Sequence, residues 1–417
     1  MAKILNIHIL GLAGVMTAPL AQALIKLGHK VTGSDQQNIY PPISNLISNI
    51  PLNQPLGAID LVIVGSSYKS FKICQEQFIE IKKKNIPYIS ATQYLAQNLI
   101  KKESILVAGS YGKTTTTALL AWLMPSANYF FGGTAIDNFP SINLSDSQWS
   151  IVEADESING LDQQAKFLYY PVKYLILTSA QWEHKESYKS VEDNFQAYKK
   201  LIQNIPPDGL LIYNPTDADI QKLLPYCKAK TIHYEKKVFD TKLIGQHNQQ
   251  NISAVFTLSK YLNIPFDISR FSGIRRRLEI ISDKDDILII DDFAQSADRV
   301  KSALEAVKFS YPHRRIVIYF EPHATFLRNQ QSLQPFKFIT DFCDEFILGK
   351  IIFSPDIKPR VTAKDWQNII GSQMKYLPLY DDVLHYLKQS LHPRDILIHF
   401  SSGGLDGLNT LKKVYNN

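Results

Sequence analysis

The sequence predicts an α/β protein built from three tandem α/β domains. Short apolar runs such as "ILNIHILG" and "IDLVIVGSS" alternate with amphipathic runs such as "LAQALIKLG" along the 417 residues. Apolar runs separated by helical patterns are typical of parallel strands that helices cover on both faces. The chain is also longer than one hydrophobic core usually supports, about 250–300 residues. We therefore expect parallel sheets in more than one domain.

The strand and helix patterns fall into three consecutive segments. Residues 1–100 are expected to form a Rossmann-like N-terminal domain. Residues 101–280 open with the strand "SILVAG", contain the helical runs "VEDNFQAYKKLIQNI" and Gln249–Tyr261, and are expected to form a central P-loop ATPase-type domain. Residues 281–417 run from "ILIIDDFA" to "DILIHFSSGG" and are expected to form a Rossmann-like C-terminal domain.

Composition and charge exclude several classes of protein. Hydrophobic residues make up 45% of the chain and charged residues 20%, as in folded proteins. The net charge of +6 is spread thinly, which disfavours nucleic acid and fits a small anionic substrate. Cys74, Cys227 and Cys343 stand far apart, so we expect reduced thiols in a cytoplasmic protein. No stretch approaches the roughly 18 apolar residues of a membrane span, so no membrane insertion is expected.

The stretch "VAGSYGKTTTT", Val107–Thr117, predicts a phosphate-binding turn. It follows a predicted strand and precedes a predicted helix, so its backbone N–H groups can converge on an anion at a helix N-terminus. Lys113 would reach the outer phosphates and the Thr114 hydroxyl would bind Mg²⁺. Val107 occupies the first glycine position of the usual motif, and a plain turn before a helix is the alternative. The residues expected to bind ATP here are Gly109, Ser110, Tyr111, Gly112, Lys113, Thr114 and Thr115.

A second glycine-rich turn stands near the N-terminus, in "HILGLAGVMTAPLAQALIKLGHKVTGSD". Gly11 and Gly14 lie at a strand-to-helix turn, and Asp35 follows the next strand about twenty residues later. This spacing is typical of dinucleotide or nucleotide-sugar sites, where the acid binds a ribose or base. Met16 replaces the third glycine, and a tight turn without a ligand is the alternative.

Two groups could complete a Mg²⁺ site beside the triphosphate. "IVEADES" places carboxylates, Glu153 among them, at the end of an apolar strand, and His184 follows another strand in "QWEHKESY". Mg²⁺ takes few protein ligands and keeps several waters, so two or three such groups suffice. Taken singly, each is more often a solvated surface residue.

Other motifs add candidates for nucleotide contacts. Asn248 and Asn251 are one helical turn apart, so their amides share a face and could bind a nucleobase edge, although a helix cap with a polar face fits as well. Arg277 in "RRRLE" could bind a γ-phosphate, although arginine runs are ordinarily solvated. Asp291 and Asp292 end a strand, where ligands of α/β sheets usually bind.

Taken in order, "GSD", "GSYGKTTTT", "EADES", His184, "GQHNQQN", "RRRLE" and "DDFA" resemble the ATP-dependent Mur ligases of peptidoglycan synthesis over nearly the whole chain. Within that family the sequence is similar to the branch of UDP-N-acetylmuramate ligases, which add L-alanine or, in recycling, a murein tripeptide. Tyr40, Pro41 and Pro42 in "YPP", the "FEPH" run at Phe320–His323 and the closing "SSGGLDGL" look closer to the recycling enzymes.

The resemblance implies an ATP-dependent amide-bond ligase with ATP and Mg²⁺ as cofactors. The muramyl carboxylate would form an acyl phosphate, which the amine of L-alanine or of the tripeptide would attack. We expect a monomer or weak homodimer, and we expect no nucleic-acid partner. The implied catalytic residues are Lys113, Glu153, His184 and Arg277; the Mg²⁺ ligands are Thr114, Glu153 and His184; the remaining ATP contacts are Asn248, Asn251, Arg277 and Asp292; and the UDP-sugar contacts are Gly11, Leu12, Ala13, Gly14, Asp35, Ser66 and Ser67.

The chain also departs from the family pattern. The family usually has "DDYAHHP" where this chain has "DDFAQSA", so Gln295 and Ser296 replace a histidine pair near the amine. Neither side chain carries a proton as imidazole does, so altered amine choice or reduced turnover is expected. Lys199 stands where some relatives carry a carbamylated lysine, but an exposed helix lysine is the favoured interpretation.

Three rival functions remain at this stage. A nucleotide-binding protein could have kept the fold and lost amide formation. A related ligase could act on another carboxylate, as in folylpolyglutamate or cyanophycin synthesis, although the complete first domain argues against it. A P-loop transporter ATPase or kinase is disfavoured because only Lys113 and Thr114 support it.

Overall fold

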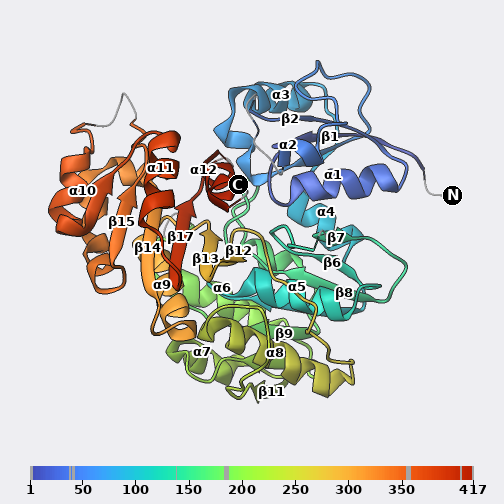
Figure 1. Cartoon of the computed structure of the whole chain (residues 1–417). Helices are drawn as coiled ribbons and strands as arrows, with labels where there is room; N and C mark the ends of the chain where they lie inside the picture. Colours follow the sequence, from blue (N-terminus) through green and yellow to red (C-terminus); the bar gives the residue numbers. More distant parts are fainter. Residues whose placement is uncertain are drawn as a thin grey trace. The chain divides into compact units, whose positions relative to one another are not determined.

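The structure is a computed structural model that describes residues 3–36, 39, 43–137, 139–182, 187–353, 358–403 and 406–415. It contains three sheets in chain order, with four, seven and six strands (Figure 1). The predicted class of tandem α/β domains is therefore confirmed. Tyr40, Pro41, Pro42 and His184, which the sequence singled out, lie outside the described residues.

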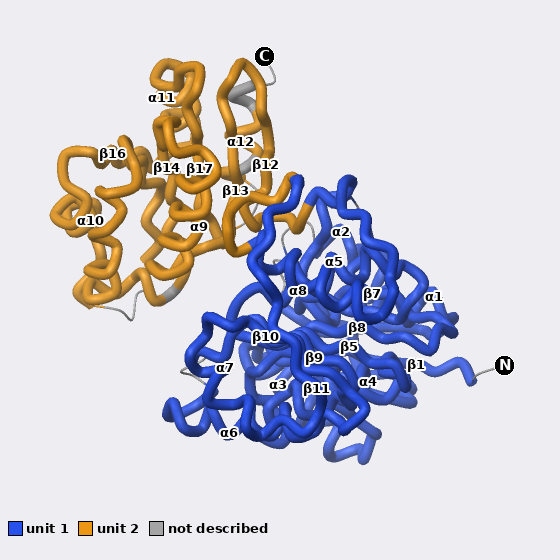
Figure 2. The backbone as a smooth tube through the Cα atoms, turned by 90° about the horizontal axis from the view of Figure 1, so that it is seen from below, with its two compact units in different colours: residues 1–241, 248–272 blue, residues 242–247, 273–417 orange. Residues whose placement is uncertain are grey.

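By compactness the chain divides into two units (Figure 2). Unit 1 comprises residues 1–241 and 248–272, and unit 2 comprises residues 242–247 and 273–417. The first two sheets both belong to unit 1, whereas the third forms unit 2. The expected boundaries after residues 100 and 280 stay a prediction, because the units are larger than the expected domains.

The first sheet is wholly parallel, in the order β2-β1-β3-β4. Buried aliphatic side chains such as Ile7, Ile9 and Ile63 explain the apolar runs of its strands. Its elements are β1 (Asn6–Leu10), α1 (Thr17–Lys26), β2 (Lys30–Ser34), α2 (Ile43–Leu46), β3 (Leu61–Val64), the 3-10 helix η1 (Ser66–Ser70), α3 (Lys72–Lys83), β4 (Tyr88–Ser90) and α4 (Ala91–Asn98).

The second sheet has the order β11-β10-β9-β5-β8-β6-β7, and only β6 and β7 pair antiparallel within it. Strand β5, which leads into the predicted phosphate-binding turn, is central. The strands are β5 (Glu103–Ala108), β6 (Asn128–Phe130), β7 (Ile142–Asn143), β8 (Trp149–Glu153), β9 (Tyr174–Leu177), β10 (Leu210–Tyr213) and β11 (Lys230–His233). The helices are α5 (Lys113–Leu123), α6 (Val191–Gln203), α7 (Ala218–Leu223) and α8 (Gln246–Leu262).

Unit 1 is held together across its two sheets. One cluster of buried apolar side chains includes Leu20 from α1 and Phe167 from the second segment. Lys69 donates a hydrogen bond of 3.0 Å to the carbonyl of Gly160, and the Asn159 amide donates one of 3.1 Å to the Ser90 hydroxyl. These contacts explain why the first two segments form one compact unit.

The third sheet has the order β12-β13-β17-β14-β15-β16, with only β12 antiparallel to its neighbour. Its strands are β12 (Glu279–Lys284), β13 (Ile287–Asp292), β14 (Arg315–Glu321), β15 (Glu345–Leu348), β16 (Met374–Tyr376) and β17 (Asp395–Ser401). Its α-helices are α9 (Ala297–Ser310), α10 (Ala363–Ile370), α11 (Tyr380–Ser390) and α12 (Asp406–Tyr415). The expected boundary at residue 280 falls inside β12, which the sequence did not assign to this sheet.

Both faces of the third sheet are covered by separate apolar clusters. One cluster includes Val300 and Leu304 of α9 and Trp366 of α10. The other includes Val383 and Leu387 of α11. Within the described part of the chain, no helix is both long and apolar enough to cross a membrane.

Candidate nucleotide-binding site

The turn between β5 and α5 requires its two glycines. Gly109 has φ +137° and Gly112 has φ +80°, a region that residues with a side chain rarely adopt. A Cβ atom on Gly109 would lie 2.2 Å from the Thr178 hydroxyl oxygen, and one on Gly112 would lie 2.4 Å from the Asn251 side-chain oxygen. The predicted glycine-rich turn at a helix N-terminus is therefore present, with its backbone in close contact with both neighbours.

Lys113 starts α5 and is fixed by two acceptors. Its Nζ donates to the Gly109 carbonyl at 2.6 Å and lies 2.8 Å from Oε2 of Glu156. Glu156 is buried, with 2% of its surface exposed. The motif "IVEADES" suggested a role for Glu153 but none for Glu156. Glu153 is the last residue of β8, whereas Glu156 follows the end of that strand, where strand alternation no longer predicts side-chain direction.

Thr114 and Glu153 meet beside Lys113. The Thr114 hydroxyl donates to Oε1 of Glu153 at 2.8 Å, and Oε2 of Glu153 accepts the Gly132 N–H at 2.6 Å. A hydroxyl and a carboxylate are hard oxygen donors of the kind that Mg²⁺ prefers, so this pair fits such an ion. Among the described residues, no group of three or more His, Cys, Asp and Glu side chains could hold a metal. The third predicted ligand, His184, lies outside them.

A partly exposed ion pair supports the loop that carries Glu156. Asp155 lies 2.8 Å from the ammonium of Lys166 and accepts hydrogen bonds from the N–H and hydroxyl of Ser157. Burial acts to raise the pKa of Asp155, but the charge and hydrogen bond of Lys166 outweigh burial and hold that pKa well below its usual range. Asp155 is therefore ionised and occupied by structural contacts.

Helix α8 brings the two predicted asparagines to the turn. Asn248 and Asn251 are buried on one face, and the Asn251 amide donates to the Asn248 side-chain oxygen at 3.2 Å. The close approach of Asn251 to Gly112 joins α8 to the phosphate-binding turn.

Lys199 has its ammonium 4.0 Å from the centre of the Tyr226 ring, a cation–π contact that engages the charged group.

The N-terminal glycine turn has the expected strand-turn-helix form. Gly11 has φ +75°, and a Cβ atom there would lie 2.7 Å from the Ser67 hydroxyl, so η1 approaches this turn. Asp35 is buried and accepts the Ala13 N–H at 2.7 Å. Burial raises the pKa of Asp35, whereas the backbone hydrogen bonds act against that rise. The structure thus brings Gly11, Ala13, Asp35 and Ser67 together, and their role in binding stays a prediction.

The two remaining predicted ATP contacts belong to unit 2. Asp292 ends β13 and accepts the N–H groups of Leu278 at 2.8 Å and Ala294 at 2.7 Å. Burial raises its pKa to about 6, against the opposing effects of these hydrogen bonds and of the Arg277 charge. Arg277 itself is exposed. Its neighbour Arg276, which the sequence analysis did not select, has its Nε 3.3 Å from a carboxylate oxygen of the buried Asp291.

Gln295, at the position of a family histidine, has a structural role in unit 2. Its side chain is buried, and its Oε1 accepts the N–H groups of His323 at 2.9 Å and Ala324 at 3.2 Å. The side chain therefore links the loop after β13 to the turn after β14. His323 is partly exposed on that turn and contributes an imidazole there.

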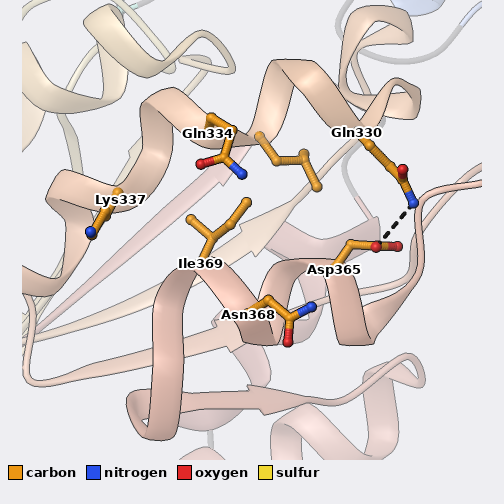
Figure 3. Close-up of a pocket in the computed structure, with 7 residues that line it drawn as sticks. Gln330, Gln334, Lys337, Asp365, Asn368 and Ile369 are labelled. Atoms are coloured by element: carbon orange, nitrogen blue, oxygen red, sulfur yellow. Dashed lines mark hydrogen bonds between the residues drawn. The ribbon is translucent and has the colours of Figure 1, made fainter.

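A shallow surface pocket also lies in unit 2, between the 3-10 helix η5 (Gln330–Asp341) and α10 (Figure 3). Asp365 at its rim is already bound by the Gln330 amide at 3.0 Å and caps its own helix through Thr362. None of the predicted site residues lines this pocket, so it is not a candidate for the nucleotide site. Its lining residues are Gln330, Leu333, Gln334, Lys337, Asp365, Asn368 and Ile369.

The three parallel-rich sheets and the Lys113 turn define a multidomain α/β protein with a glycine-rich turn of the P-loop type between β5 and α5. The family described as Mur ligase middle domain matches residues 107–237. The chain is 27% identical to the UDP-N-acetylmuramate–L-alanine ligase of Wigglesworthia glossinidia brevipalpis, over 98% of this chain and 95% of that protein. It is 28% identical to the UDP-N-acetylmuramate–L-alanyl-gamma-D-glutamyl-meso-2,6-diaminoheptandioate ligase of Escherichia coli K12, over 78% and 80% of the two chains.

Solved structures show the same fold. The UDP-N-acetylmuramate–alanine ligase of Thermotoga maritima superposes with a TM-score of 0.76, at 20% identity and 98% coverage of both chains. A murein peptide ligase of Psychrobacter arcticus gives a TM-score of 0.64, at 22% identity and 99% coverage of both. Residues 107–237 thus match the middle domain of the Mur ligases, and the relatives that are similar over most of the chain are Mur ligases, ATP-dependent enzymes that form C–N bonds. The resemblance found in the sequence is confirmed.

Proposed function

We propose that this protein is an ATP-dependent ligase that joins the carboxylate of UDP-N-acetylmuramate to the amine of L-alanine or of a murein tripeptide. The observation that carries the proposal is the geometry of the Lys113 turn. A side chain on Gly109 or Gly112 would collide with neighbouring residues, and the Lys113 ammonium is held by the Gly109 carbonyl. The chain is similar over most of its length to ligases that use L-alanine and to ligases that use the tripeptide, which supports the proposal. ADP and phosphate would be the other products.

The reaction would proceed in two displacements. A muramyl carboxylate oxygen attacks the γ-phosphorus of ATP, ADP leaves, and an acyl phosphate forms. The amine then attacks the acyl carbon, and the tetrahedral intermediate expels phosphate as the amide forms. Two anions must meet in the first step, so catalysis depends on positioning and on neutralising charge.

Lys113 would neutralise that charge. Its ammonium is aligned by the Gly109 carbonyl and by Glu156, so little reorganisation is needed when phosphate oxygens approach. Glu156 would keep the ammonium in place before the nucleotide enters. Asn248 and Asn251 would contact the adenine, and Arg277 and Asp292 are the two other residues that we assign to ATP.

Thr114 and Glu153 would hold Mg²⁺, together with His184. When bound, this ion would supply positive charge to the phosphate oxygens. The hydroxyl of Thr114 and the carboxylate of Glu153 are already oriented by their mutual hydrogen bond and by the Gly132 N–H. The UDP group would bind at the Gly11 turn, near Asp35 and Ser67.

The amine is the least determined substrate. Gln295 engages backbone N–H groups through its oxygen, so it cannot serve as the proton carrier that a histidine provides. We propose that amine recognition depends on other groups of the 321–324 turn, such as His323. The free thiols of Cys74, Cys227 and Cys343 fit the cytoplasm, where we place the reaction, and we propose a monomer or weak homodimer.

One assay tests the proposal. The purified protein would be incubated with UDP-N-acetylmuramate, ATP and Mg²⁺, with L-alanine in one sample and the murein tripeptide in another. We expect phosphate release that requires both the muramyl nucleotide and an amine, and a product whose mass is the sum of the two substrates minus water. ATP and UDP-sugar binding without phosphate release would instead identify a protein that kept the sites and lost ligation.

A further inference from the structure

Unit 2 contains a buried cluster of ionisable groups around His399. Strand β17 lies between β13 and β14, and His399 pairs in register with Asp291 on one side and Tyr319 on the other. The His399 side chain is fully buried. Its Nδ1 lies 2.7 Å from Oδ1 of Asp291, and its Nε2 lies 2.7 Å from Oε2 of Glu321. One imidazole therefore bridges three adjacent strands.

The geometry determines the charge of this imidazole. A carboxylate only accepts hydrogen bonds, so a ring nitrogen that faces one must carry a hydrogen. A neutral imidazole has one such hydrogen, and either tautomer would leave a lone pair 2.7 Å from a carboxylate oxygen. The imidazolium satisfies both contacts. Burial acts to raise the pKa of Glu321, but hydrogen bonds from His323 and His399 hold that pKa well below its usual range, so Glu321 is ionised.

The cluster is electrically balanced. Asp291 and Glu321 contribute two negative charges, and His399 and Arg276 contribute two positive charges. Arg276 also donates to the carbonyls of Ser401 and Gly403, which tethers the loop after β17. Balanced charge is what allows four ionised groups to be buried together.

Other titratable groups border the cluster on each side. The Tyr319 ring stacks on His399 with centroids 5.1 Å apart, and the Tyr380 hydroxyl donates to Oε1 of Glu321 at 3.0 Å. His323 Nε2 lies 3.6 Å from the same oxygen. A Cβ atom on Gly407 would lie 2.2 Å from Oε2 of Glu321, so the start of α12 closes the cluster beside Asp406. The groups that face His399 or its partners are thus Asp291, Arg276, Tyr319, Glu321, His323, Tyr380 and Asp406.

Both carboxylates immediately precede loops of the candidate site. Asp291 is followed by Asp292, and Glu321 is followed by the turn that carries His323. Gln295 joins the same two loops through hydrogen bonds to the backbone. Two sets of contacts therefore fix the distance between the ends of β13 and β14. One is the buried ionic bridge through His399, and the other is the side-chain amide of Gln295.

We propose that His399 is a positioning residue: as an imidazolium bridging Asp291 and Glu321, it fixes the ends of β13 and β14 and so aligns the Asp292 and His323 loops. This rests on the proposed function, because these loops would contact ATP and the amine. His399 touches neither substrate. Its loss would lower turnover by misplacing reacting groups, while UDP-sugar binding in unit 1 would be unchanged.

Spectroscopy of the unmodified protein tests the charge state directly. With ¹⁵N-labelled histidine, the His399 signals are those that disappear in His399→Leu, or in His399→Gln if the first variant does not fold. At pH 7 we expect both ring nitrogens of His399 to carry hydrogens. A neutral ring at pH 7 would overturn the proposal whether or not the protein is a ligase.

Kinetics separate positioning from folding. His399→Leu leaves the cluster with one net negative charge, whereas His399→Leu/Glu321→Gln restores neutrality without the bridge. We expect the double variant to regain thermal stability but to keep kcat reduced by up to about 100-fold, the cost of a misplacement of about 1 Å. UDP-sugar affinity should stay at the wild-type value, and the matched control His385→Gln should behave as wild type.

The two failures can be distinguished. A stable double variant with wild-type kcat from pH 7 to pH 9 would overturn the positioning role while the ligase function stands. A wild-type protein without ligation would refute the proposed function, and the role of His399 in that reaction with it. In that case the histidine spectrum still decides whether the ionic bridge exists.

Discussion

Replacing Lys113 by methionine tests the phosphate-binding turn and its buried partner together. Methionine keeps the length of the side chain but removes the ammonium that lies 2.8 Å from Glu156. The side chains of the pair are only 12% and 3% exposed, so solvent cannot replace the lost charge. Breaking a buried pair by removing one partner typically costs about 3–5 kcal/mol. At the lower end this predicts a fall in Tm of about 6–12 °C for a unit of this size.

The double variant Lys113→Met/Glu156→Gln separates stability from catalysis. Glutamine removes the unpaired charge, so most of the lost stability should return, with a coupling free energy of about 2–3 kcal/mol in the double-mutant cycle. Turnover should stay at least about 10²–10³-fold below wild type in both variants, because the charge that faces the phosphates is missing. Calorimetric unfolding and phosphate release provide the two measurements. Wild-type turnover in Lys113→Met, or a double variant no more stable than the single one, would refute this account of the turn.

Three further predictions concern single positions. Gly112→Ala should weaken ATP binding at least about tenfold, a loss of about 1.4 kcal/mol, because its Cβ would displace Asn251; calorimetric titration against Gly57→Ala, where a Cβ meets nothing within 4 Å, checks it. Burial raises the pKa of Asp292 to about 6, so the wild type loses stability as pH rises from about 4 to about 6. Asparagine does not ionise, but its NH2 group loses one of the two backbone hydrogen bonds that Asp292 accepts, so the prediction concerns the pH profile. In denaturant titrations, the stability of Asp292→Asn relative to the wild type should rise by up to about 3 kcal/mol from pH 4 to pH 7. For His399, burial acts to lower the pKa, but its two carboxylate partners raise it to about 8. About 2 kcal/mol of unfolding free energy that is present below pH 6.5 should therefore be lost by pH 9. An unfolding free energy that does not change over this pH range would contradict the prediction.

The phosphate-binding turn could be predicted because its determinants are local. A strand, two glycines with positive φ and a helix that starts at Lys113 follow each other between Glu103 and Lys113. The spacing of Asn248 and Asn251 likewise predicts a shared helix face. Their approach to Gly112 could not be predicted, because it depends on where α8 packs.

The His399 cluster could not be predicted because it depends on strand order. β17 is the last strand in the described part of the chain. It nevertheless lies between β13 and β14, which follow each other in the sequence. Only that order brings His399 between Asp291 and Glu321. In the sequence, the histidine stands inside the apolar run "DILIHFSS", where nothing marks it as a charged group. Likewise "RRRLE" does not indicate that Arg276 rather than Arg277 pairs with the buried Asp291.

The contacts of Gln295 could not be predicted for a similar reason. The sequence indicated a lost proton carrier near the amine. The structure adds that the side chain links two loops through backbone N–H groups, which follow a strand far away in the sequence. A substitution that removes one chemistry can thus supply a structural contact, and only the packed loops reveal it.

Transfer of an oxygen label tests the central claim most directly. UDP-N-acetylmuramate with ¹⁸O at both carboxylate oxygens would be incubated with ATP, Mg²⁺ and the amine that supports turnover. If the carboxylate attacks the γ-phosphorus at the Lys113 turn, each phosphate released during ligation should contain one ¹⁸O atom by mass spectrometry. Unlabelled phosphate would show that the acid is never phosphorylated, and the account of this site would be wrong.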